Sequence, residues 1–285
     1  MVSTQTAPKQ IIQKRRSRDA AWWVYAVLII GGVVTAFPFL WMFLTSLKTY
    51  ADVFQPAIFP SNPTLENYTE VLKNTGFIRW FVNSVGVAVV STISVLIFDS
   101  MVAYTLAKLR FPGKEIIFIL ILSTIMIPTE MLIIPWYLGS LKLGIANTYF
   151  AIALPGMISA FGIFLLRGFF EGIPDELFDA GRLDGLSEFG LYTRIGLPLV
   201  TPALSALAIF NFLGNYNAFL WPLIIVQSQE MRTLPIGIAL FSGEAGTQWH
   251  LIMTASSLAV IPVLIVFAIF QKQIIEGVVL TGTKG

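Results

Sequence analysis

Six stretches of this sequence are long enough to cross a membrane and carry almost no charge. Five charge-free runs cover 20–47, 80–98, 143–166, 195–229 and 251–271, and a sixth run, 116–141, contains only Glu130. A helix needs about 20 apolar residues to cross the roughly 30 Å hydrocarbon core of a bilayer. We therefore expect an all-α integral membrane protein with six transmembrane helices. Their expected positions are about 22–46, 80–106, 116–138, 148–170, 199–226 and 251–271.

The composition excludes several classes of protein. Only 12% of the 285 residues are charged and 56% are hydrophobic, whereas a soluble domain carries about 25% charged residues. Six apolar helices buried in a soluble core would leave too little polar surface for solubility. The sequence has no cysteine, so no disulfide or thiolate metal site is possible, and its net charge of +2 argues against a nucleic-acid partner. We predict no catalytic site and no metal site.

The basic residues predict which way the chain sits in the membrane. Six spans put both termini on one side, and if that side is cytoplasmic it holds thirteen of the 18 Lys and Arg residues. The positive-inside rule therefore places both termini in the cytoplasm. The first apolar stretch exceeds the length of a signal-peptide core, and we expect it to remain as an uncleaved anchor. The expected segments are a cytoplasmic basic tail (1–21), the first helix with an extracytoplasmic loop (22–79), a five-helix core (80–272) and a cytoplasmic tail (273–285).

The inner loop at 172–198 differs from the other loops because it encodes short helices. Pro174 suits the first turn of a helix, and the two acidic residues after it complement the helix dipole. Gly185 suits the left-handed residue that ends this helix, and Ser187 can cap the next one. Pro198 then opens the following membrane helix. We expect a rigid helix–turn–helix outside the bilayer.

This loop resembles the cytoplasmic motif of ATP-binding-cassette import permeases. That motif reads Glu-Ala-Ala, three residues, Gly, nine residues, Ile, one residue and Leu-Pro, and its spacing is fully kept here. Asp179 stands where the motif has Glu, and Gly181 where it has the second Ala. The resemblance implies that the loop couples this chain to an ATPase. The residues concerned are Asp179, Ala180, Gly181, Asp184, Gly185, Ile195, Leu197 and Pro198.

Further stretches resemble the carbohydrate branch of that family, specifically the maltose-importer type. They lie at 103–108, 111–114, 127–130, 134–137, 216–223 and 271–285. The resemblance implies the type I importer permease architecture, with a cytoplasmic coupling helix, in a bacterial inner membrane. It implies import of a sugar or oligosaccharide with four partners: two ATPase subunits, a second homologous permease subunit and an extracytoplasmic sugar-binding protein. The chain lacks a phosphate-binding loop, so we expect ATP and Mg in the ATPase subunits and no cofactor here.

Polar residues within the expected spans are candidates for the substrate path. A carboxylate in a membrane helix costs roughly 2.5–3.5 kcal/mol, so it normally faces a partner, a cavity or water. Amide groups suit sugar hydroxyls, and an aromatic ring can stack on a sugar. The candidates are Glu130, Asn211, Asn215, Tyr216 and Asn217. Polar packing between helices or subunits is the alternative, and for Asp99 we expect a structural role or protonation.

Other functions remain to be weighed against a permease coupled to an ATPase. A permease of the same superfamily could carry a solute other than sugar. A secondary transporter could use carboxylates such as Glu130 to carry protons, but it gives no reason for the inner loop, and the two halves of the chain show no clear repeat. An intramembrane enzyme would need a paired nucleophile and base or a metal cluster, and none is visible. We favour the coupled permease.

Overall fold

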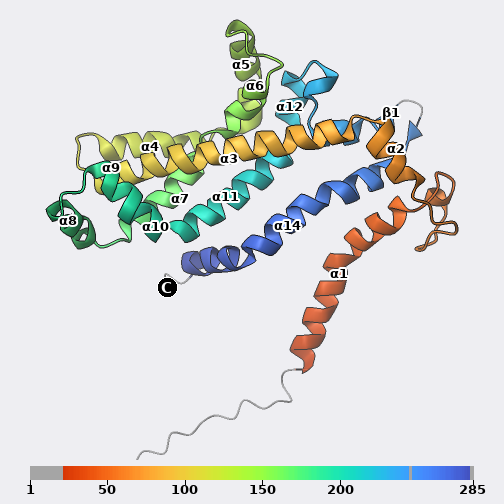
Figure 1. The fold of residues 1–285 in the computed structure, drawn as a ribbon, viewed down its shortest axis with the longest axis horizontal. Helices are drawn as coiled ribbons and strands as arrows, with labels where there is room; N and C mark the ends of the chain where they lie inside the picture. The colour runs from red at the N-terminus through yellow and green to blue at the C-terminus, as the bar shows by residue number, and fades with distance from the viewer. Residues whose placement is uncertain (1–21, 244–245, 283–285) are drawn as a thin grey trace, which may run out of the picture.

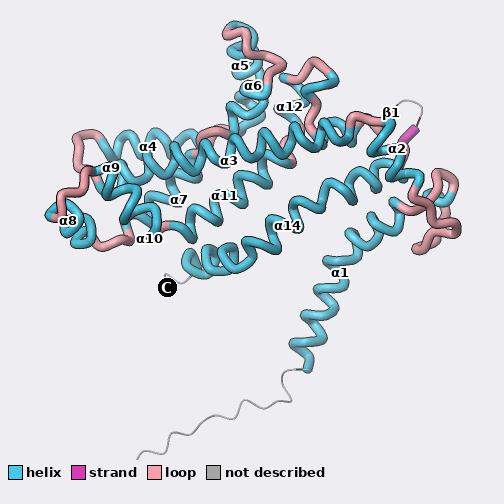
Figure 2. Tube along the Cα trace, viewed as in Figure 1, coloured by secondary structure: helices cyan, strands magenta, loops and turns pink. Residues whose placement is uncertain are grey.

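The computed structural model describes residues 22–243 and 246–282, with side chains described as far as Ile269. The predicted basic tail at 1–21 lies outside the described residues, as do the last three residues of the predicted C-terminal tail. The described part is predominantly helical, as the sequence predicts. Figure 2 shows that loops gather at the ends of long helices.

In the part of the chain that the structure describes, three helices are long and apolar enough to cross a membrane singly: α1 (Trp22–Ser46), α3 (Phe77–Lys108) and α14 (Trp249–Gly282). α3 runs through the middle of the molecule and packs along α7 (Ala160–Glu171) and α11 (Thr201–Tyr216). α1 diverges from this body and meets α14, and most of its large apolar side chains are exposed (Figure 1). α14 continues beyond the predicted helix end at 271 into the predicted tail.

Three further candidate spans are bent pairs of helices. Two of the bends fall inside the spans predicted at 116–138 and 148–170, which differs from the prediction, and the third lies where the inner loop enters the span predicted at 199–226. The bends are 99° between α4 and α5, 46° between α6 and α7, and 78° where the chain enters α11. Proline explains one of them directly: Pro128 precedes α5, lacks a backbone N–H and disfavours helix in the residue before it. Counting each bent pair as one span gives up to six, which agrees with the sequence. The elements are α4 (Lys114–Ile125), α5 (Thr129–Lys142), α6 (Tyr149–Ala153), the 3₁₀ turn η3 (Leu154–Gly156), α9 (Glu188–Leu191), the π-helical turn η4 (Tyr192–Gly196), α10 (Leu197–Leu199) and α12 (Leu220–Ile225).

The two ends of α3 carry different kinds of structure. Short elements surround its N-terminal end, including α2 (Glu66–Asn74). At the other end lie α8 and α9, which form the helix–turn–helix of the inner loop (Figure 1). The remaining elements are η2 (Asp52–Phe54), α2 (Glu66–Asn74), α8 (Asp175–Leu183), η5 (Gln229–Met231), α13 (Leu234–Ala239) and a small antiparallel pair, β1 (Ser242–Gly243) with β2 (Gly246–Thr247).

A buried aromatic and aliphatic cluster fixes α8 and α9 to the end of α3. Tyr104 lies at its centre and contacts the rings of Phe170, Phe178 and Tyr192 at centroid distances of 5.3–5.9 Å. Phe178, on α8, is only 1% exposed. Burying a side chain of this size contributes about 1.5–3 kcal/mol. The inner loop is therefore a packed extension of the helical body.

Candidate functional site

The turn between α8 and α9 has the geometry that its sequence predicts. Gly185 adopts a left-handed conformation with a φ of 83°. The N–H of Leu186 donates to the carbonyl of Gly181 and the N–H of Gly185 to that of Arg182, both at 3.0 Å. These two bonds form a Schellman motif, which satisfies the last carbonyls of α8. Ser187 caps α9 by accepting from the N–H of Gly190 at 3.2 Å.

The departure from Ala at Gly181 has a structural explanation. Gly181 is buried, and a Cβ there would lie 2.5 Å from Cδ2 of Leu191 and 2.8 Å from Cδ1 of Ile195. The glycine thus lets α8 approach α9 and η4 closely.

The other motif residues differ in exposure. Asp179 and Ala180 are exposed on α8, and Asp184 is the C-cap of α8. Leu197 is partly buried, and Pro198 is in the first turn of α10.

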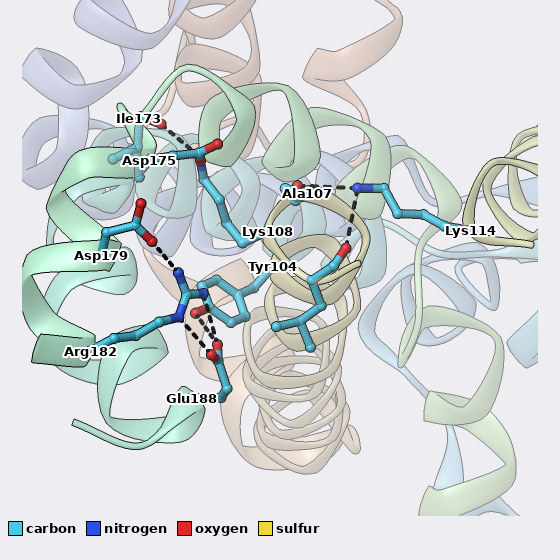
Figure 3. A network of polar contacts seen from close by, with 10 residues as sticks. Tyr104, Ala107, Lys108, Lys114, Ile173, Asp175, Asp179, Arg182 and Glu188 are labelled. Atoms are coloured by element: carbon cyan, nitrogen blue, oxygen red, sulfur yellow. Dashed lines mark hydrogen bonds and ion pairs between the residues drawn. The ribbon is translucent and has the colours of Figure 1, made fainter. Parts of the chain in front are cut away.

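An ion network joins the two helices of the inner loop (Figure 3). Arg182 donates to Asp179 at 2.8 Å and to Glu188, at the start of α9, at 2.9 Å. The hydrogen bond to Glu188 is the main reason why the pKa of Arg182 is raised above its usual value. Lys108 pairs with Asp175 at 2.6 Å, and this hydrogen bond lowers the pKa of the Asp175 carboxyl. Asp175 therefore stays ionised, and the pair intact, until the pH falls through that lowered pKa.

The break between α6 and α7 forms a second polar site, in the middle of the helical body. Its backbone groups lose their helical partners and are satisfied by neighbouring side chains. Ser91 and Ser94 of α3 donate to the carbonyls of Ala153 and Met157 at 3.3 and 2.8 Å. Asp99 accepts from the N–H of Ser159 through both carboxylate oxygens, at 3.1 and 3.2 Å. Backbone N–H and C=O groups inside a membrane must be paired in this way, because no water is available there to hydrogen-bond to them.

Two of the substrate-path candidates belong to this second site. Asn211 donates to the carbonyl of Gly156 at 3.5 Å and accepts from Thr92 at 3.3 Å. Asn215 donates to the carbonyl and side-chain oxygens of Asn211, at 2.9 and 3.0 Å. Their amides are thus engaged in helix packing, the alternative that the sequence left open. A path-lining role for them stays a prediction.

The other candidates lie elsewhere. Tyr216 is buried, stacks on Phe212 and donates to the carbonyl of Ala259 at 2.9 Å. Asn217 is exposed at the end of α11, and within the described ranges its side-chain amide donates only to the carbonyl of Leu213. Glu130 is exposed in the first turn of α5, at the sharpest bend, and has no recorded hydrogen bond or ion pair within the described residues. Asn217 and Glu130 are therefore the candidates whose polar groups remain accessible.

Sequence reasoning missed the role of the serines on α3. Pro155 and Gly156 inside the expected span at 148–170 are the signal that could have revealed the break. Ser91 and Ser94, three residues apart, share the face of α3 that meets it. Lys108, further along α3 than Asp99, contacts Ile173 and Asp175 at the end of the helix. No group of three or more metal-ligating side chains occurs within the described ranges.

The polar break predicts that Asn211, on α11, matters for stability and that Asn217, the C-cap of α11, does not. We expect Asn211→Ala to lower the stability of the solubilised protein, because it leaves a carbonyl of the break unpaired, at a cost of about 1–2 kcal/mol. Asn217→Ala should leave stability unchanged. Thermal unfolding followed by size-exclusion chromatography measures both. A stable Asn211→Ala variant with altered uptake would instead place Asn211 on the substrate path.

Comparison with known proteins identifies the family. The model of the binding-protein-dependent transport system inner membrane component matches residues 99–279, more than half of the chain, including the inner loop and the polar break. The chain belongs to this family. It is therefore a multi-pass membrane permease of a transport system, and its six expected spans and inner loop agree with that membership.

Curated relatives and a solved structure support the same assignment. The chain is 35% identical to the arabinooligosaccharides transport system permease protein AraQ of Halalkalibacterium halodurans, over 95% of this permease and 100% of AraQ. It is 31% identical to the diacetylchitobiose uptake system permease protein NgcG of Streptomyces coelicolor, over 91% and 87%. It is 32% identical to the sn-glycerol-3-phosphate transport system permease protein UgpE of Brucella abortus, over 90% and 95%. A chain of a bacterial transporter that imports alginate matches with a TM-score of 0.80 at 25% identity, over 90% and 97%.

Proposed function

We propose that this permease is one subunit of an ATP-driven, binding-protein-dependent importer of oligosaccharides in the bacterial inner membrane. The relatives AraQ and NgcG support this substrate class, since their names refer to arabinooligosaccharides and diacetylchitobiose. The similar solved transporter imports the polysaccharide alginate. The inner loop, with its full motif spacing and Schellman turn, is the observation that most supports coupling to an ATPase.

In this proposal α8 docks on an ATPase subunit through its exposed face. Asp179, Ala180 and the turn at Asp184 and Gly185 are accessible there, while Phe178 holds the helix to the body. ATP and Mg bind in two ATPase subunits, and this chain supplies no cofactor site. Its own role is to convert movement of α8 into alternating access of the membrane path.

Two other partners complete the proposed complex. A second, homologous permease subunit supplies the other half of the channel, and the exposed apolar surfaces of α1, α4 and α5 are available to it or to lipid. A sugar-loaded binding protein docks at the opposite end, near α2, α13 and the small β pair. A related transporter has been solved with a periplasmic protein carrying an alginate pentasaccharide, at 16% identity and a TM-score of 0.52.

The proposed orientation, with both termini cytoplasmic, predicts a pattern of chemical labelling. Single cysteines at Ser61 and Ser242 should react with an impermeant thiol reagent added to intact cells without an outer barrier. A cysteine at Leu183, which is 90% exposed on α8, should react only after the membrane is opened. The chain has no native cysteine, so the background is clean. Labelling of Leu183→Cys in sealed cells would show that the chain has the opposite orientation.

Purification of the tagged permease with its partners tests the assembly. We expect it to carry two copies of ATPase subunit and one further permease, in detergent or nanodiscs. A stable complex without any ATPase would contradict the proposal.

One relative favours a second substrate class. UgpE is named for sn-glycerol-3-phosphate, and it covers this permease almost as completely as the oligosaccharide relatives do. Uptake assays with labelled glycerol 3-phosphate and with short oligosaccharides separate the two classes. If only glycerol 3-phosphate is taken up, the substrate class is polyol phosphates and not oligosaccharides.

A further inference from the structure

Two side chains on the last turns of α3 contact both helices of the inner loop. Tyr104 and Lys108 are four residues apart and so share one face of α3. Figure 3 shows Lys108 directed at the start of α8 and Tyr104 directed at Glu188, the first residue of α9. α3 is thereby attached at two separate points to the segment that carries the family motif.

Lys108 forms the attachment to α8. Its Nζ donates to the carbonyl of Ile173 and to Asp175 Oδ1, each at 2.6 Å, and lies 5.0 Å from the centre of the Phe178 ring. The side chain is only 5% exposed, whereas that of Asp175 is 70% exposed. A buried ammonium that holds one carbonyl and one carboxylate is a directional contact, since charge-assisted bonds are short and strong.

Tyr104 forms the attachment to α9. Its hydroxyl donates to Glu188 Oε2 at 3.3 Å, and the same carboxylate accepts from Arg182. Its ring packs between Phe170, Phe178 and Tyr192. A displacement of either helix of the loop therefore acts on the end of α3.

The covalent connections of the loop are less direct. The chain enters α8 through Gly172 and Pro174. After α9 it continues through η4 and then bends by 78° into α11. α3, in contrast, is one continuous 32-residue helix that packs along α7 and α11. A stiff helix fixed at its end transmits movement along its length better than a bent connection.

We infer that Lys108, assisted by Tyr104, is a positioning residue that transfers movement of α8 to α3, and so links ATP hydrolysis to opening of the membrane path. This inference rests on the proposed function, because it needs an ATPase docked on α8. Movement of α8 then reaches α3 through contacts between side chains, in addition to the covalent connections of the chain.

The test compares Lys108→Met with Lys114→Met in the complete transporter reconstituted in liposomes. Met keeps the apolar stem against Phe178 and removes the ammonium. Lys114 is a matched control, because among the described residues its Nζ donates to the carbonyls of Ala107 and Leu109 and forms no hydrogen bond or ion pair with the inner loop. The quantity measured is the number of substrate molecules imported per ATP hydrolysed, with loaded binding protein present.

We expect Lys108→Met to assemble and hydrolyse ATP but to import about tenfold less substrate per ATP, the size expected for one charge-assisted hydrogen bond. Lys114→Met should keep the wild-type ratio, and Lys108→Arg should recover most of it, since a guanidinium can donate to both acceptors.

Two outcomes would overturn the inference. One is an unchanged ratio in Lys108→Met; the other is a smaller amount of complex that retains the wild-type ratio, which would make Lys108 purely structural. If the wild-type complex itself shows no hydrolysis linked to import, the proposed function fails as well. If wild type is coupled and only the Lys108 result is negative, the inference fails alone.

Discussion

Replacing Gly185 with Val is expected to abolish substrate-driven uptake while the protein still inserts into the membrane. The φ of 83° costs a non-glycine residue about 1–2 kcal/mol, and more if it is β-branched. Apart from the glycine and its two chain neighbours, no atom of the described residues lies within 4 Å of a Cβ built at this position, so the penalty comes from the backbone. The turn should open, and α8 and α9 should lose their mutual geometry. Uptake and ATP hydrolysis in liposomes, with membrane-fraction amounts as reference, measure the effect.

Asn at position 185 is the internal control. Asn tolerates the left-handed conformation better than other non-glycine residues, so Gly185→Asn should retain much of the uptake. Gly190→Ala, in α9 with ordinary backbone angles, should behave as wild type. If Gly185→Val preserves full sugar-stimulated hydrolysis and uptake, the inner loop is not the coupling element.

The second large effect is expected at Gly162, in the first turn of α7. A Cβ there would collide with Oδ2 of Asp99 and lie 3.1 Å from Cδ2 of Leu207. Gly162→Ala should push α7 away from α3 and weaken the bonds between Asp99 and the N–H of Ser159. Overpacking of this kind costs about 1–3 kcal/mol. We expect a lower unfolding temperature and reduced uptake.

Gly168 supplies the matched comparison on the same helix. Apart from its chain neighbours and the nearby backbone of α7, no described residue lies within 4 Å of a Cβ placed there, so Gly168→Ala should leave stability equal or slightly increased through better helix propensity. Fluorescence-detected size-exclusion chromatography after heating compares the two variants. Equal melting of Gly162→Ala and wild type would show that the close approach of α7 to Asp99 is not structurally required.

The spans and the inner loop were predictable because strong local signals encode them. Runs of uncharged residues locate the membrane segments, and the prolines and Gly185 locate the limits of the loop helices. The observed Schellman turn at Gly185 and the Ser187 cap are local features that depend on residues within a few positions of each other. Such features can be read from one sequence.

The breaks within the spans were harder to predict because tertiary contacts stabilise them. An apolar run containing Pro155 and Gly156 still fits one span by length. Only the approach of Ser91, Ser94 and Asp99 from α3 pairs the backbone groups that the break exposes. The role of Asn211 depends on the same arrangement, which is why its polarity alone suggested the substrate path.

The attachments of Lys108 and Tyr104 also needed the structure. They join residues 67 and 84 positions apart in the sequence, and neither contact follows from periodicity. Figure 3 shows how they converge with Arg182 on the two short helices.

The most direct test of the account is transport by the purified complex in liposomes. The wild-type permease, assembled with its partner subunits, should accumulate labelled oligosaccharide only when ATP and the loaded binding protein are both present. Under those conditions ATP hydrolysis should rise with uptake, and Gly185→Val should remove that rise. Accumulation driven by an ion gradient without ATP, or unaffected by Gly185→Val, would contradict the claim that this chain is an ATP-coupled importer permease.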